Sequence, residues 1–186
     1  MKKFVVTGGP SVGKTSTLEE LINRGYCVVP EASRRIITAE QEKERTIAHY
    51  SPIVPWTNVK LFQEYVLEEQ NRLEAEVDQE IVFLDRGKID LLGYAAHFKI
   101  ILDDTLRANI LAADYEKVFL LDPLPQYEND TARKESREEG LQIHHAIAEA
   151  YKSHHFTVIS VPVMSIADRA DFIEYYSTIT SQNKKR

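Results

Sequence analysis

Residues 8–15 of the chain read Gly8-Gly9-Pro10-Ser11-Val12-Gly13-Lys14-Thr15, and they match the pattern G-x-x-x-x-G-K-[ST]. The short apolar run Phe4–Val6 precedes this stretch, and helical spacing follows it at Leu18, Leu21 and Ile22. Glycines let the backbone curve around a phosphate group so that its N–H groups point inward. The helix that follows presents the positive end of its dipole to the same anion. The sequence therefore predicts a strand, a phosphate-binding loop and a helix, in that order.

The chemistry of a nucleoside triphosphate explains the residue types in this loop. Lys14 can bridge the β- and γ-phosphates, and the Thr15 hydroxyl can coordinate Mg²⁺. The alternative is a glycine-rich turn that caps a helix and holds no ligand, but the flanking strand and helix favour the nucleotide site. We therefore expect ATP and Mg²⁺ as cofactors. The residues expected to bind the nucleotide are Gly8, Gly9, Pro10, Ser11, Val12, Gly13, Lys14, Thr15 and Ser16.

Five short apolar runs indicate the strands of one sheet. Most are continuously apolar rather than alternating, which is typical of parallel strands covered on both faces. The runs are Phe4–Val6, Tyr26–Val29, Ile81–Leu84, Val118–Leu121 and Phe156–Val161. With helical segments between them, they predict an α/β fold: a doubly wound parallel sheet between two layers of helices, with right-handed crossovers. We expect residues 1–180 to form this single domain and residues 181–186 to form a basic tail.

Apolar spacing also predicts where several helices begin and end. One long helix is expected to carry Val59 through Val77 on one face, and another to run from Ile89 to Ile100. Ser165 and Asp168 have the spacing of a capping box at the start of the last helix. The stretch Thr46–Thr57 has no period and is predicted to be a loop.

Composition excludes several classes of protein. The chain has 186 residues, of which 43% are hydrophobic, and a formal net charge of −6, so a dedicated nucleic-acid-binding module is disfavoured. Its single cysteine excludes an intrachain disulfide framework. No apolar run approaches the length of about 18 residues that a membrane helix needs, and the N-terminal apolar run is too short for a signal peptide. We expect a cytoplasmic protein without a membrane partner, and the oligomeric state stays open.

Three classes of protein with this phosphate loop compete. A guanine-specific GTPase would carry N/T-K-x-D after a late strand, which is missing, and the D-x-x-G of Asp90–Gly93 falls inside a helical pattern. A motor ATPase would need a strand that ends in Asp-Glu and a helical lid domain, for which the chain has no room. A small kinase needs a triphosphate site, an acceptor pocket and a lid that carries arginines, and this chain can supply all three.

Four stretches together resemble one group of phosphate-loop proteins. They are Gly8–Thr15, Pro30–Arg35 (P-E-A-S-R-R), Phe83–Gly87 (F-L-D-R-G) and Arg133–Gly140 (R-K-E-S-R-E-E-G). The chain resembles the small AAA-type ATPase/kinase domains akin to ribosylnicotinamide kinase domains and, more distantly, nucleoside and nucleotide kinases. This resemblance implies a five-stranded parallel sheet in the order 2-3-1-4-5, adenine near Pro162–Ser165, and a lid between the fourth and fifth strands. Acceptor specificity would then lie within Thr38–Glu80.

Two carboxylates are candidates for the chemistry. Glu31 follows the second strand, at the sheet edge where ligands bind in doubly wound folds. It can accept a proton from an acceptor hydroxyl, hold a Mg²⁺-bound water, or simply start the next helix. Asp85 ends the third strand, beside the first in the implied order, and so near Thr15. It can position Mg²⁺, act as the base, or serve only as a strand-end cap.

Arginines complete the predicted site. Arg86 can point into the acceptor or phosphate region, or pair with Asp85 or Glu31. Of the adjacent Arg34 and Arg35, one is expected to contact the acceptor and the other to be a solvated charge; we favour Arg34 for the substrate. Arg133 and Arg137 are four residues apart and share a helix face, so both could close over the γ-phosphate, or form ordinary surface pairs.

The histidine pairs and the tryptophan have competing interpretations. His144-His145 and His154-His155 invite a metal-site interpretation, but adjacent side chains point apart on a helix, so a packing or surface role is favoured. Trp56 could stack on a base or pack at the entry of the next helix.

The favoured function is a Mg-ATP-dependent kinase that phosphorylates a hydroxyl of a small, nucleoside-like acceptor. Lys14, Glu31, Asp85, Arg133 and Arg137 would be its catalytic residues, with Thr15 and Asp85 at the metal. The main alternative is a regulatory ATPase or GTPase switch that has no small-molecule acceptor. A polynucleotide 5′-kinase is disfavoured by the net charge.

Overall fold

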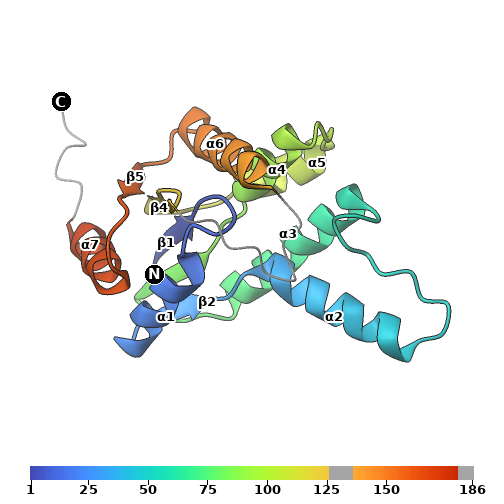
Figure 1. Cartoon of the computed structure of the whole chain (residues 1–186), viewed down its shortest axis with the longest axis horizontal. Coiled ribbons are helices and arrows are strands. Elements are labelled where there is room, and N and C mark those ends of the chain that lie inside the picture. Colours follow the sequence, from blue (N-terminus) through green and yellow to red (C-terminus); the bar gives the residue numbers. More distant parts are fainter. Residues whose placement is uncertain (126–135, 180–186) are drawn as a thin grey trace.

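The computed structural model describes residues 1–125 and 136–179, and in them one sheet has five parallel strands. The strands are β1 (Lys2–Thr7), β2 (Cys27–Val29), β3 (Ile81–Asp85), β4 (Lys117–Leu121) and β5 (Val158–Val161). Their spatial order is β2-β3-β1-β4-β5 (Figure 1), which confirms the implied order. The phosphate loop therefore follows the central strand, with the end of β3 on one side and the end of β4 on the other.

Helices cover both faces of this sheet because the strands are apolar on both faces. Along β1, Phe4 and Val6 pack in a cluster with α1 (Lys14–Asn23) and α7 (Ile166–Thr178). Val5 packs in the opposite cluster, with α3 (Val59–Ala75), α4 (Asp90–His97), α5 (Asp104–Leu111) and α6 (Arg137–Ser153). The helix α2 (Ala32–Thr46) lies against α3, at the end of the molecule opposite α7 (Figure 1). The three-layer α/β prediction is confirmed.

Two predicted helices end earlier than the apolar spacing indicated. The α3 helix stops at Ala75, so Val77 lies beyond it, and the Glu80 carbonyl already accepts a hydrogen bond from the Lys2 N–H of the sheet. The α4 helix stops at His97 because Lys99 adopts a left-handed φ of 54° and Ile100 N–H turns back to the Ala95 carbonyl. Apolar residues continue past the end of both helices, and Val77 and Leu102 pack against the core from the loops. The spacing of apolar residues alone does not distinguish such positions from a helical face.

Other local predictions hold. Ser165 Oγ accepts a hydrogen bond from Asp168 N–H at 3.2 Å, as expected of the capping box that starts α7. Asp90–Gly93 lies inside α4, as the helical pattern indicated, and Gly93 packs against α6 so closely that a Cβ would lie 2.7 Å from Ile147 Cα. Within residues 1–125 and 136–179, no helix is long and apolar enough to cross a membrane.

Candidate active site

The phosphate loop has the backbone conformation that its sequence predicts. Gly8 and Gly13 have positive φ values of 140° and 84°, and Ser11 is left-handed at 57°. Lys14 starts α1 and is buried, and its Nζ donates hydrogen bonds to the carbonyls of Gly8 at 3.2 Å and Gly9 at 2.7 Å. Thr15 is exposed at the first turn of the helix. The loop thus places an ammonium group and a hydroxyl where a triphosphate and its cation would lie.

Two residues far along the chain hold this loop in place, and the sequence predicts neither contact. On α6, buried His144 accepts a hydrogen bond at Nδ1 from the Gly9 N–H, 3.3 Å away. On α7, buried Arg169 donates to the carbonyls of Val12 at 2.6 Å and Pro162 at 3.2 Å. These contacts join the phosphate loop to two helices and to the segment after β5.

The electrostatics of His144 agree with a packing role. Burial disfavours the imidazolium, and His145 and Lys14 repel it, so the pKa of His144 falls to about 4. A neutral ring is also what the geometry requires, since Nδ1 accepts a hydrogen bond and cannot carry a proton. Among the residues that the structure describes, no three His, Cys, Asp or Glu side chains gather as a metal site.

Asp85 lies at the end of β3, in register with Val6 of the central strand. It lines a cavity of about 640 Å³ between α1 and α2 together with Thr15 and Glu31; we call this the α1–α2 cavity. Its Oδ1 is buried and has no hydrogen-bond partner among the described residues. Burial and the nearby charge of Glu31 raise the pKa of Asp85 above its ordinary value, although Lys14 and Arg86 oppose this shift.

These features fit a magnesium ion. Mg²⁺ prefers carboxylate and hydroxyl oxygens and retains several of its waters, and an unpartnered buried carboxylate oxygen is an unusual cost in a folded protein. Asp85 and Thr15 border the same cavity, at the edge of the sheet where the phosphate loop ends. The residues present therefore suit the metal that the phosphate-loop motif implies.

Glu31 is positioned by other side chains rather than by capping. It occupies the N-cap of α2, yet its carboxylate makes no capping hydrogen bond. Instead, Oε1 accepts hydrogen bonds from Ser33 Oγ at 2.6 Å and from Arg86 Nε at 3.2 Å, and Arg34 Nε lies 3.7 Å from Oε2. Burial opposes ionisation, but the charges of Arg86 and Lys14 outweigh it and lower the pKa of Glu31. Glu31 is therefore an ionised carboxylate at neutral pH.

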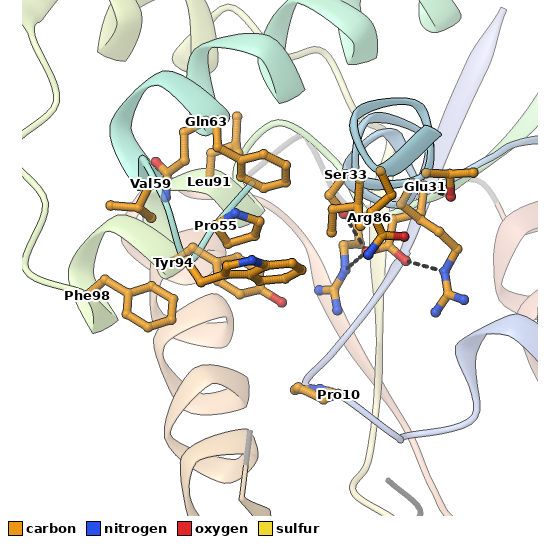
Figure 2. Close-up of a pocket in the computed structure, with 16 residues that line it drawn as sticks. Pro10, Glu31, Ser33, Pro55, Val59, Gln63, Arg86, Leu91, Tyr94 and Phe98 are labelled. Atoms are coloured by element: carbon orange, nitrogen blue, oxygen red, sulfur yellow. Dashed lines mark hydrogen bonds and ion pairs between the residues drawn. The ribbon is translucent and has the colours of Figure 1, made fainter. Parts of the chain in front are cut away.

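An aromatic cavity opens beside Glu31. It has a volume of about 270 Å³ and is lined by Trp56, Phe62, Tyr94 and Phe98, by Gln63, and by Glu31, Arg34 and Arg86. Figure 2 shows Val59, Leu91, Tyr94 and Phe98 on one side, Glu31, Ser33 and Arg86 on the other, and Pro10 of the phosphate loop at the border. We call this the aromatic cavity. It joins an apolar recess to an ionised carboxylate next to the phosphate loop.

The remaining predicted site residues are arginines. Arg34 lines both cavities, and Arg35, which pairs with Glu69 at 2.9 Å and is half exposed, also borders the α1–α2 cavity, so the choice of Arg34 for the substrate stays a prediction. Arg137 is exposed at the start of α6 and borders a small cavity with Pro10, Ser11 and Val12 of the phosphate loop. Arg133 lies outside the described residues. Arg86 was predicted either to point into the acceptor or phosphate region or to pair with Asp85 or Glu31. It pairs with Glu31 and also lines the aromatic cavity.

Sequence patterns had not indicated two lining residues of the aromatic cavity. Gln63 is buried on α3, and its Oε1 has no hydrogen-bond partner among the described residues. Tyr94 on α4 lies with its ring 5.5 Å from the Arg86 guanidinium carbon. Both fall in apolar helical stretches, so their sequence signal is that of core positions. Trp56, for which stacking on a base was one alternative, lies in the wall of the cavity.

The fold and this site define a P-loop NTPase of the kinase-like type. A sequence model of the AAA domain matches residues 3–169, and the chain belongs to that family. No curated protein matches it.

Solved structures support the same fold. A deoxyadenosine kinase from M. mycoides with the products dCMP and a flexible dCDP bound is similar, with a TM-score of 0.67, 14% identity and coverage of 95% of this chain and 100% of that one. The same enzyme with dATP bound gives a TM-score of 0.64, 14% identity and coverage of 96% and 100%. A NadR protein in complex with NR gives 0.65 and 16% identity over 99% of this chain, which spans about half of that protein (53%).

Proposed function

We propose that this protein transfers the γ-phosphoryl group of ATP to a hydroxyl of a small, nucleoside-like acceptor. The observation that carries the proposal is the aromatic cavity, which ends at the ionised Glu31 beside the phosphate loop. A switch that only hydrolyses nucleotide needs no recess for a second molecule. The similarity to a deoxyadenosine kinase and to a NadR protein bound to NR supports a nucleoside-like acceptor.

The nucleotide end of the proposed site rests on the phosphate loop. Its N–H groups and Lys14 would hold the β- and γ-phosphates, while Thr15 and Asp85 would hold Mg²⁺, directly or through water. When bound, the metal neutralises charge that develops on the transferred group. The cavity lining places Asp85 and Thr15 together, and the unpartnered Oδ1 of Asp85 has an oxygen to offer.

The acceptor end rests on the aromatic cavity. Trp56, Tyr94 and Phe98 offer flat apolar surface to a ring, and the Gln63 carbonyl oxygen offers a hydrogen-bond acceptor. Glu31 would accept the proton of the acceptor hydroxyl as that oxygen attacks the γ-phosphorus and ADP leaves. Arg86 would hold the carboxylate in place and, with Arg34 and Arg137, favour the negative charge of the phosphates.

The test is an acceptor screen. The protein would be incubated with Mg-ATP and a mixed pool of nucleosides, nucleotides, sugars and a 5′-hydroxyl oligonucleotide, with mass spectrometry to detect any molecule that gains one phosphoryl group. We expect a nucleoside-like product that Lys14→Ala and Glu31→Gln do not form. Loss of ATP without a phosphorylated product would select the regulatory switch, and a phosphorylated oligonucleotide would select the polynucleotide kinase.

A binding measurement supports the screen. Trp56 is the only tryptophan of the chain and lines the aromatic cavity, so its fluorescence can report on the occupation of that cavity. Acceptors found in the screen should change this emission in saturable fashion, and molecules that the protein does not phosphorylate should not. A product whose binding leaves Trp56 emission unchanged would place the acceptor elsewhere.

A further inference from the structure

Asp90, at the first turn of α4, is the meeting point of four hydrogen-bond donors in the core beneath Glu31. Its Oδ1 accepts from Thr7 Oγ1 at 2.5 Å and Arg86 Nη1 at 3.1 Å. Its Oδ2 accepts from the Gly87 N–H at 3.1 Å and Tyr151 Oη at 2.6 Å. Asp90 is only 3% exposed. Two oxygens that each accept two hydrogen bonds leave this buried carboxylate well satisfied.

These donors come from distant parts of the chain and converge on the segment that carries the proposed chemistry. Thr7 ends β1 just before the phosphate loop, and Tyr151 comes from the far half of α6. Arg86 and Gly87 directly follow Asp85. Arg86 adopts a left-handed φ of 68°, a conformation that a residue with a side chain keeps only when its surroundings impose it. The bonds from Asp90 to the Arg86 side chain and to the Gly87 N–H supply that constraint.

Arg86 in turn fixes the position of the Glu31 side chain. Its guanidinium is buried and donates to three acceptors: Asp90, the Gly8 carbonyl at 3.1 Å and Glu31 Oε1 at 3.2 Å. A planar guanidinium that two further acceptors hold can point its Nε–H in one direction only. The position of the Glu31 carboxylate at the mouth of the aromatic cavity therefore depends on the position of Arg86.

We propose that Asp90 is a positioning residue of this site: with Tyr151 and Thr7 it immobilises Arg86, and through Arg86 it aims Glu31 at the acceptor hydroxyl. The inference rests on the proposed phosphotransferase function, which it deepens. Misplacement of a reacting group by about 1 Å can cost about 100-fold in rate. Asp90 thus acts on the rate of transfer without touching either substrate.

A second buried carboxylate in the same core provides a matched control. Glu74 on α3 is also 3% exposed and accepts a hydrogen bond from a buried tyrosine, Tyr115, at 2.9 Å. Both Tyr115 and Tyr151 pack on Phe156 and lie close to Gly87. Glu74 pairs with Lys3 rather than with Arg86. Tyr151→Phe removes a hydrogen bond to Asp90 itself, whereas Tyr115→Phe removes one to Glu74 and also the acceptor of the Lys88 N–H, 2.8 Å away, so Glu74→Gln is the closer control.

The kinetic test compares Asp90→Asn and Tyr151→Phe with Glu74→Gln and Tyr115→Phe, using the acceptor from the screen. We expect Asp90→Asn to lower kcat by about 10–100-fold and Tyr151→Phe by about 2–10-fold, with both KM values within about twofold of wild type. Glu74→Gln and Tyr115→Phe should retain kcat within about twofold despite a similar loss of melting temperature. A kcat for Asp90→Asn as high as that of Glu74→Gln would overturn the proposal.

A readout that needs no turnover separates this proposal from the proposed function. The Nε–H of Arg86, assigned by its loss in Arg86→Lys, should give a slowly exchanging ¹⁵N resonance in wild type, Glu74→Gln and Tyr115→Phe. It should exchange faster in Tyr151→Phe and Asp90→Asn. If the Arg86 Nε–H exchanged as slowly in these two variants as in wild type, the proposal would be overturned. Faster exchange together with a normal kcat would overturn it as well. If wild type phosphorylates nothing, the proposed function fails, while the resonance still decides whether Asp90 holds Arg86.

Discussion

At the scale of single residues, a bound triphosphate would have to replace the hydrogen bonds that the Lys14 ammonium makes within the phosphate loop. Its ammonium donates two hydrogen bonds to the loop carbonyls of Gly8 and Gly9 and is 4% exposed, so the charge already lies within the loop. Phosphate oxygens at the β/γ position would offer it charged partners, and hydrogen bonds to charged groups contribute about 1.5–3 kcal/mol.

We therefore expect Lys14→Ala to abolish turnover and to weaken Mg-ATP binding by about 10–100-fold. Mg-ADP, which lacks the γ-phosphate, should lose less affinity. Calorimetric titration of both nucleotides against wild type and variant measures the difference. Equal losses for the two nucleotides would contradict a role for Lys14 at the β/γ end.

The two carboxylates of the site should respond differently to neutralisation. Since Glu31 is ionised and lies at the mouth of the aromatic cavity, Glu31→Gln should lower kcat by about 10²–10⁴ while leaving ATP affinity nearly intact.

Because the pKa of Asp85 is raised, protons should compete with Mg²⁺ there, and the Mg²⁺ concentration for half-maximal rate should rise as the pH falls. Asp85→Asn should raise this concentration and flatten its pH dependence. If Glu31→Gln keeps most of its turnover, Asp85 is the base or no base is needed.

Single residues also show where prediction from sequence ends. The phosphate loop is predictable because its function depends on a local backbone path that eight consecutive residues determine. His144 and Arg169 contact the same loop from 135 and 157 residues away, and no local pattern records such contacts. Gln63 and Tyr94 belong to helices whose apolar spacing indicates only burial, so their place in a cavity follows from tertiary packing alone.

At the scale of elements, α6 connects the parts of the site. Arg137 at its first turn borders the phosphate loop, His144 accepts from Gly9, and Tyr151 donates to Asp90. The strands and most helices were predictable because burial on both faces gives a strand a continuous apolar run, and burial on one face gives a helix a regular spacing of apolar residues. The ends of α3 and α4 were not, since apolar residues follow both helices, and Val77 and Leu102 pack against the core from outside them.

Arg137 gives a prediction about the start of this helix. Because it is exposed next to Pro10, Ser11 and Val12, its guanidinium can meet charge on the transferred phosphoryl group, a contribution that can reach about 10³ in kcat. We expect Arg137→Ala, and Arg133→Ala with it, to lower kcat at least about tenfold with little change in melting temperature. Arg107→Ala, an exposed arginine on α5, is the control and should leave both unchanged. Normal turnover in the Arg133/Arg137 double variant would mean that both are surface charges and would favour the switch.

His144 gives a prediction about the middle of the helix. Its pKa is lowered in the fold to about 4 from an ordinary value of 6.5, so the unfolded chain binds the proton more readily than the folded one. The stability that the neutral ring provides is therefore complete above pH 6.5 and is lost progressively as the pH falls toward 4. In His144→Asn, the amide oxygen can still accept from Gly9 and does not titrate. Between pH 7 and pH 5, urea unfolding should show a smaller loss of unfolding free energy for this variant than for wild type, and His155→Asn, an exposed position beyond α6, should behave as wild type.

At the scale of the whole molecule, Lys117 ties the last helix to the sheet. It lies in β4, is 5% exposed, and its Nζ donates to the carbonyls of Tyr176 at 2.6 Å and Ile179 at 2.5 Å. A buried ammonium that loses its acceptors costs at least about 1–3 kcal/mol, and the last carbonyls of a helix are its natural partners. The folded unit should therefore need the chain as far as Ile179.

This requirement gives a test of the proposed domain boundary at residue 180. Removal of residues 181–186, which are polar and basic, should change the melting temperature by no more than about 1 °C, because this part of the sequence carries no apolar residue for the core. Removal of residues 176–186 takes both acceptors from Lys117 and the Tyr176 ring from its contact with Phe172, and should lower the melting temperature by about 5 °C or more. Lys117→Met in the longer truncation is the control, since an apolar side chain needs no acceptor and should recover part of the loss. Equal melting temperatures for the two truncations would place the boundary before residue 176, whereas a large loss on removal of residues 181–186 would extend the domain to the end of the chain.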